Sequence, residues 1–135
     1  MLLILSFVYC VFGFRKQGVG VKGKLLCDGK PLHNAKVKIF DVDRNPGDSD
    51  DLLDEKYTDI NGEFVLDGTT RELTNIEPEL RIFHDCNDDI RPCQRKLVVK
   101  IPGDYIHSGT AEKWFHFQKD LFERKLDEDR SCHQT

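Results

Sequence analysis

Apolar and polar side chains alternate with a period of two residues from Val19 almost to Lys119, in short stretches separated by Gly, Asn, Asp and Pro. This is the period of a β-strand whose two faces meet different surroundings, whereas an amphipathic helix repeats every 3.6 residues. In the stretch 35–40 one face is apolar, and the other face carries Lys36, Lys38 and Phe40. The chain is therefore expected to fold as β-sheet.

The turn residues divide this pattern into strands. A first strand is expected over residues 19–27 with a bulge at Gly23, because glycine inside a strand often marks one. The turn Asp59-Ile60-Asn61-Gly62 joins two extended stretches and predicts a β-hairpin. Further strands are expected at 35–40, 80–86, 97–101 and 114–117.

Seven or eight short strands without a long helical stretch indicate an all-β fold, an antiparallel β-sandwich of two sheets, with a closed barrel as the main alternative. Residues 14–118 are expected to form this single domain. In residues 119–135 the spacing of the apolar side chains changes, which predicts a short C-terminal helix or a tail.

Residues 1–13 form an uncharged apolar run followed at once by Arg15 and Lys16. The run is too short to cross a bilayer and is typical of a secretory signal peptide, with cleavage expected near Gly13. The protein is therefore expected to be secreted and extracellular, not membrane-spanning.

Cleavage would remove Cys10 and leave four of the five cysteines: Cys27, Cys86, Cys93 and Cys132. In an oxidising compartment these four predict two disulfides, with three possible pairings. Their spacing matches no usual zinc motif, so no metal site is expected from them.

Four segments together resemble the transthyretin-like family of secreted nematode proteins: VKGKLLCDGKPLHNAKVKIFDVD, DLLDEKYTDINGEFVLDG, EPELRIFHDCND and PCQRKLVVKIPGDYI. The resemblance covers roughly residues 19–109. It implies a transthyretin-type sandwich of seven or eight strands, export, and binding rather than catalysis. In such a sandwich Cys27 ends its strand near the 86–93 turn, and longer loops constrain the unfolded chain more, so the pairs Cys27–Cys93 and Cys86–Cys132 are expected.

The histidines are the obvious starting points for catalysis, and they are scattered singly. His84 shares a face with apolar residues and is expected to be a core histidine bonded to backbone near a disulfide. The 5-hydroxyisourate hydrolases, which have a related sandwich, end in Tyr-Arg-Gly-Ser, whereas this chain ends in Ser-Cys-His-Gln-Thr. A hydrolase that uses His84 or His116 is therefore an alternative that the sequence does not favour, and no cofactor is expected.

Two charged segments stand out in a chain whose net charge is only −4, which gives no reason to expect nucleic-acid binding. The acidic run contains Asp41, Asp43, Asn45, Asp48, Asp50 and Asp51. It fails the EF-hand calcium template and favours a solvated loop, with weak calcium binding as the alternative.

The basic segment contains Arg91, Arg95, Lys96 and Lys100 without a carboxylate between them, and Arg81 lies on the preceding strand. If the two strands pair, these five cations form one exposed area that attracts phosphate or carboxylate groups. The alternative is that the charges keep an edge strand soluble.

The sequence therefore predicts a secreted, disulfide-braced binding module for an extracellular lipid, glycan or protein partner. Bridging of an anionic cell surface to a receptor is one form of this function. A carrier of a small hydrophobic ligand is the alternative from a different class. The sequence leaves the oligomeric state and the ligand open.

Overall fold

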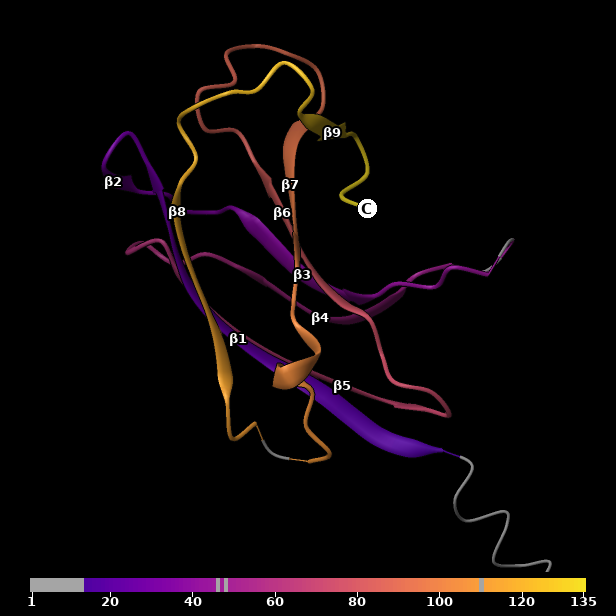
Figure 1. Ribbon diagram of the computed structural model, residues 1–135. Helices are drawn as coiled ribbons and strands as arrows, with labels where there is room; N and C mark the ends of the chain where they lie inside the picture. The colour runs from indigo at the N-terminus through magenta and orange to yellow at the C-terminus, as the bar shows by residue number, and fades with distance from the viewer. Residues whose placement is uncertain (1–13, 46, 48, 110) are drawn as a thin grey trace, which may run out of the picture.

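The computed structural model describes residues 14–45, 47, 49–109 and 111–135, so the expected signal peptide lies outside the described residues. The described part of the chain holds nine strands in two sheets, which confirms the all-β prediction (Figure 1). The strands are β1 (Arg15–Cys27), β2 (Lys30–Pro31), β3 (Lys36–Asp41), β4 (Asp51–Tyr57), β5 (Glu63–Glu72), β6 (Pro78–His84), β7 (Gln94–Lys100), β8 (Trp114–Asp120) and β9 (Asp129–Ser131), with a 3₁₀ turn η1 at Gly103–Tyr105.

One sheet is built around the long strand β1, which pairs with β2, β5 and β8. The β1–β5 pairing is antiparallel, but β8 lies parallel to β1, so the expectation of a wholly antiparallel sandwich needs this correction. Both registers run through Gly23 without a shift, and the predicted bulge is absent. Gly23 is required for another reason, because an added Cβ would lie 2.4 Å from the ring of Phe64.

The other sheet has the order β4-β3-β6-β7-β9, and all its pairings are antiparallel. The predicted turn forms, but the predicted hairpin does not, because β4 pairs with β3 and β5 pairs with β1, so the turn connects the two sheets. In its Asn-Gly sequence Gly62 has φ +75°, a conformation that glycine adopts without steric cost. The strands and the position of this turn follow from the period-two pattern and the turn residues, whereas the strand pairing does not.

The core lies between the sheets and contains the inward-facing side chains of both. Fully buried members come from β1, β3, β5 and β6: Val19, Val21, Leu25, Val37, Ile39, Leu66, Leu80 and Ile82. These residues occupy alternate positions along their strands, as the alternation predicted. Among the described residues, no helix has the length and apolar character that crossing a membrane requires.

A short helix or a tail was expected for residues 119–135; no helix forms there, and the end of this segment joins the sandwich. Leu121 is buried, whereas residues 122–127 are exposed and lie outside regular structure. Beyond them, β9 adds an edge strand to β7, with Ser131 opposite Gln94. The apolar spacing that suggested a helix therefore has a single core contact, at Leu121.

Two disulfides form among the four expected cysteines, but the expected pairing is wrong. The structure pairs Cys27 with Cys86, and Cys93 with Cys132. The second pair follows from β9, because the β7–β9 register brings the residue before Gln94 next to the residue after Ser131. The expected pairing rested on the length of the loop that each disulfide would close. In the structure, strand pairing decides which cysteines lie close enough to bond.

Candidate binding site

The two strands that carry the predicted basic residues do pair, yet two of the five cations are not available to a partner. Arg81 on β6 is 8% exposed. Its Nη2 lies 2.6 Å from Oδ2 of Asp50, and its Nε lies 2.7 Å from Oε2 of Glu79. The Arg81 charge is therefore compensated within the chain.

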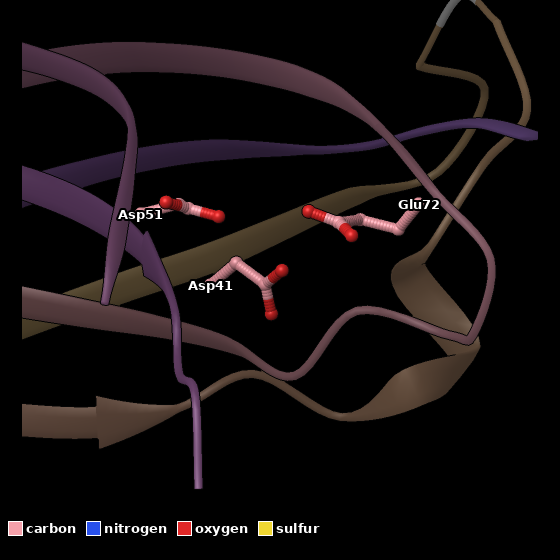
Figure 2. A group of neighbouring side chains, drawn as sticks. All are labelled: Asp41, Asp51 and Glu72. Carbon is pink, nitrogen blue, oxygen red and sulfur yellow. The ribbon is translucent and has the colours of Figure 1, made fainter. Parts of the chain in front are cut away.

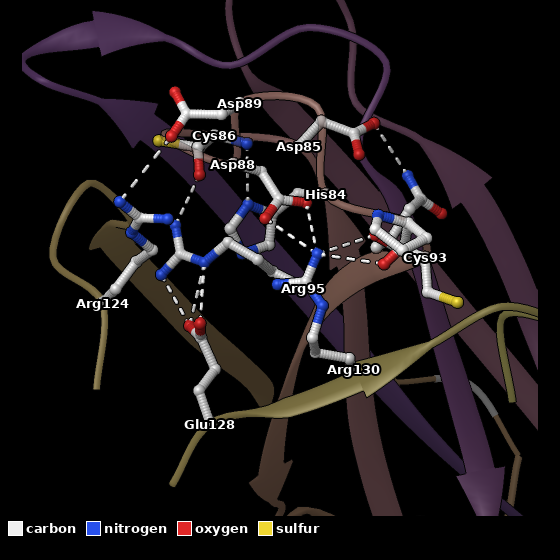
Figure 3. Close-up of polar contacts among 12 residues, drawn as sticks. His84, Asp85, Cys86, Asp88, Asp89, Cys93, Arg95, Arg124, Glu128 and Arg130 are labelled. Carbon is white, nitrogen blue, oxygen red and sulfur yellow. Dashed lines mark hydrogen bonds and ion pairs between the residues drawn. The ribbon is translucent and has the colours of Figure 1, made fainter. Parts of the chain in front are cut away.

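Arg95 on β7 is 2% exposed and points into the protein. It forms a bidentate ion pair with Glu128 and donates to the backbone oxygens of Cys86, Leu121 and Glu123 (Figure 3). Because five predicted cations were expected on one exposed area, this inward arginine is a clear correction. Arg95 holds the ends of two loops together.

The other three predicted cations lie at the surface. Lys100 is exposed and Lys96 is half-buried, and both belong to β7. Arg91 is exposed but belongs to the 85–93 loop rather than to the sheet. The structure therefore keeps Lys96 and Lys100 on one strand and separates Arg91 from them.

The outer face of the five-stranded sheet brings two further lysines to this area. Across β3, β6 and β7, three rows of neighbours run Lys36–Phe83–Lys96, Lys38–Arg81–Val98 and Phe40–Glu79–Lys100. We call these nine residues the basic face, because five are cations and one is an acid. The 35–40 alternation carried the signal for Lys36 and Lys38, which the sequence analysis did not assign to the site.

Aromatic rings contact some of the cations of the basic face, and Arg81 and Lys38 are two of them. The guanidinium of Arg81 lies 4.1 Å from the ring centroid of Phe40, and Nζ of Lys38 lies 5.6 Å from that of Phe83. Such cation–π contacts restrict long side chains that would otherwise move freely in water. The charges of Arg81 and Lys38 are thus held in place before any partner arrives.

Carboxylates compensate only part of this charge. Lys36 pairs with Glu55 at 2.8 Å, while Nζ of Lys38 donates to the backbone oxygen of Gln134 at 2.6 Å. Within the described residues, Lys96 and Lys100 have no carboxylate oxygen within 4.0 Å. These two lysines can therefore bind an anion without breaking an existing ion pair.

His84 has the place that the sequence predicted. It is 2% exposed, and its Nδ1 accepts the backbone N–H of Cys86, which forms a disulfide with Cys27. Burial, together with the neighbouring Arg95 cation, lowers the pKa of His84 from 6.5 to about 4. Its imidazole is neutral near pH 7, and Nδ1 is already used.

Three carboxylates form the one acidic cluster found among the described residues. Oxygens of Asp41, Asp51 and Glu72 lie within 4.8 Å of one another and point toward a common centre (Figure 2). Burial raises the pKa of Asp41, and burial with the charges of Asp41 and Asp51 raises the pKa of Glu72. Oxygen ligands at this spacing are chemically suited to a hard cation such as calcium.

The acidic loop is more structured than a solvated loop. Asp50 accepts hydrogen bonds from Arg81 and from the backbone N–H of Asp43, and the Arg81 hydrogen bond lowers the pKa of Asp50. Oδ1 of Asp43 accepts a hydrogen bond from the backbone N–H of Asn45. Asp48 lies outside the described residues.

Comparison with known proteins gives a family match. A family model described as TTR-52, transthyretin-like family, matches residues 22–102. Transthyretin-like protein 33 of Caenorhabditis elegans is 46% identical over 112 residues, which cover 81% of this chain and 78% of that protein.

Two further relatives come from the same organism. Transthyretin-like protein 5 is 46% identical over 111 residues, covering 82% of this chain and 78% of its own length. Transthyretin-like protein 1 is 37% identical over 147 residues, covering 98% of this chain and 94% of its own length. The similarity thus reaches beyond the segments that first indicated it.

Proposed function

The chain belongs to the transthyretin-like family, and we propose that it is an extracellular binding module whose basic face holds an anionic partner. The observation that carries this proposal is the pair Lys96 and Lys100, which lie on an ordered sheet face without a carboxylate partner among the described residues. Lys38, bound only to a backbone oxygen, is the third contributor.

The partner follows from the chemistry of this face. Lysines bind phosphate, sulfate or carboxylate groups as point charges, and each one contributes about 1 kcal/mol near an anionic membrane. Lys96 and Lys100 lie four residues apart on β7, about 13 Å at the rise of a strand, which exceeds the screening length of about 8 Å at physiological salt. Each lysine therefore acts at contact on its own anionic group of the partner. Anionic lipid heads, acidic glycans and acidic receptor domains all present such groups. A lipid-bound module could also bridge that surface to a receptor.

Two disulfides support an oxidising, extracellular location. A binding role without catalysis is supported by His84, whose ring is buried, neutral near pH 7 and bonded to backbone. The hydrophobic-carrier alternative gains no support from the hollow that borders the start of β1. That hollow, about 660 Å³, is bordered by polar residues that include Arg15, Asn75 and Lys113.

Co-sedimentation with vesicles tests the proposal. The wild-type protein should bind phosphatidylcholine vesicles more strongly when they contain phosphatidylserine. Lys96→Glu combined with Lys100→Glu should remove that difference. The matched control combines Lys22→Glu with Lys30→Glu, which changes the net charge equally at exposed positions of the other sheet.

A parallel screen against extracellular receptor domains and sulfated glycans covers the other anionic partners. Each partner found should lose affinity in the Lys96→Glu/Lys100→Glu variant and not in the control. If every detected partner ignores the charge reversal, the basic face is not the binding site.

A further inference from the structure

The buried ring of His84 keeps one nitrogen that the described part of the chain does not use. Nδ1 accepts the backbone N–H of Cys86 at 3.2 Å, so the proton of the neutral ring is on Nε2. Nε2 donates to no acceptor among the described residues, and no carboxylate oxygen of theirs lies within 4.0 Å of it. Because buried donors rarely stay without an acceptor, this N–H is suited to an oxygen atom from outside the chain.

A hollow of about 270 Å³ lies beside this ring, where the 121–129 segment passes β7. His84 borders the hollow together with Leu97 and Leu121. In the described part of the chain, the one fully enclosed side-chain nitrogen or oxygen without a partner is Nε2 of His107, so Nε2 of His84 is not sealed inside the protein. His84 as a whole is only 2% exposed, and the hollow is therefore the route by which Nε2 is reached.

The charged groups next to His84 already use each other. Arg95 holds Glu128 in a bidentate pair and spends its other donors on backbone oxygens (Figure 3). The inner part of the hollow thus offers one open donor, the His84 N–H, beside the aliphatic side chains of Leu97 and Leu121. Pockets for small molecules combine an apolar lining with a few placed polar groups in this way.

The mouth of the hollow carries no excess charge. Three lysines and three acids border it, and none of the six lies within 4.0 Å of an opposite charge among the described residues: Lys96, Lys119, Lys125, Glu123, Asp127 and Asp129. This balance attracts neither anions nor cations over a distance. A charged group that entered the inner part would lose its hydration without gaining an unpaired counter-ion. The electrostatics therefore favour a neutral ligand.

We propose that this hollow binds a small neutral aliphatic molecule with one acceptor oxygen, such as a ketone, an ester or an alcohol. The oxygen accepts the N–H of His84, and the aliphatic chain packs on Leu97 and Leu121. The hollow is slightly smaller than the range of about 300–1,000 Å³ typical of sites for drug-sized ligands, so the ligand is smaller than a drug. The proposal does not rest on the basic face, although Lys96 borders both regions.

An NMR titration of the full chain with 2-hexanone at pH 7 tests the proposal. The ring signals of His84 should shift and saturate, while those of the other four histidines stay unchanged as internal controls. Two probes keep the six-carbon chain and change the polar group. Hexylamine is protonated and has no acceptor, and hexanoate carries a charge into the hollow, so both should bind at least about tenfold more weakly than 2-hexanone.

His84→Phe keeps a ring and removes the donor. It should weaken 2-hexanone binding about tenfold, whereas the control His116→Phe, at an exposed position of β8, should bind as wild type does. The wild-type titration decides the proposal even where His84→Phe does not fold.

Three results would overturn the proposal. They are unshifted His84 signals, equal shifts at all five histidines, and binding of hexylamine or hexanoate that is as tight as binding of 2-hexanone. A folded His84→Phe variant with wild-type affinity would also overturn it. The Lys96→Glu/Lys100→Glu variant should keep 2-hexanone binding, so failure of this site and failure of the basic face are separate results.

Discussion

Glu128 receives the guanidinium of Arg95 in a two-point contact, with Nη2 2.6 Å from Oε1 and Nε 3.0 Å from Oε2. The pair joins β7 to the segment that leads into β9. Arg95 also donates to three backbone oxygens, so one buried side chain holds the 85–93 loop and the 121–128 segment at one end of the five-stranded sheet.

Replacement of Arg95 by Met should therefore destabilise the fold strongly. Removing one partner of a buried ion pair costs about 3–5 kcal/mol, because Glu128 and the backbone oxygens lose their donors. The matched control is Arg91→Met, at an exposed position, which should change stability by less than about 0.5 kcal/mol. Urea unfolding compares the two variants. Equal stabilities would show that Arg95 does not organise this end.

His84 should make stability depend on pH between about 6.5 and 4. Its folded-state pKa is lowered to about 4, so in this window the unfolded chain binds a proton that the folded chain excludes. Stability falls as pH decreases through the window, by on the order of 3 kcal/mol from this group. His84→Gln should flatten the slope there. An NMR titration that gives His84 a pKa near 6.5 would contradict the argument that burial lowers it.

The disulfide pairing is open to direct measurement. Peptide mapping of the unreduced protein should recover Cys27 linked to Cys86, and Cys93 linked to Cys132. The closed loops span 59 and 39 residues, so removal of either bridge by paired Cys→Ala variants should cost about 4 kcal/mol by the chain-entropy model. Recovery of a peptide that links Cys86 to Cys132 would contradict the structure.

Replacing each of two neighbouring aspartates of the acidic loop by asparagine should change the stability of the fold differently. Asp50→Asn should destabilise the protein by about 1–2 kcal/mol, since Asp50 pairs with the nearly buried Arg81. Asp51→Asn should be neutral or slightly stabilising, because it removes one of three crowded carboxylates. Differential scanning calorimetry in calcium-free buffer measures both changes.

The same calorimetry distinguishes a crowded acidic cluster from a metal site. Millimolar calcium should leave the melting temperature of the wild-type protein unchanged. A rise in the wild type that is lost in Asp51→Asn would instead place calcium at the cluster.

Local features of the fold could be predicted because they rest on local sequence. The period-two pattern located the strands, and the Asn-Gly sequence located the turn before β5 (Glu63–Glu72), although the strands on either side of that turn belong to different sheets and form no hairpin. The burial of His84 followed from its place on an apolar face. The parallel strand β8 and the edge strand β9 could not be predicted, since pairing of distant strands leaves no local signature.

The candidate site was predictable only in part, for the same reason. Arg95 alternates along β7 with Leu97 and Val99, which are partly buried against the core. The period-two pattern alone could therefore have predicted that the Arg95 side chain points inward. Its partner Glu128 is 33 residues away, and no spacing indicates that contact. The Cys93–Cys132 bridge depended likewise on β9.

The most direct test of the basic face is the salt dependence of binding to phosphatidylserine vesicles. Wild-type partitioning should weaken steeply as salt rises from 50 to 300 mM, because the screening length shortens over this range. The neutralised variant Lys96→Gln/Lys100→Gln should bind more weakly at low salt and respond less to salt. The control Lys22→Gln/Lys30→Gln, at exposed positions of the other sheet, should follow the wild type. If the two variants have the same affinity and the same salt dependence, the basic face does not hold the anionic partner.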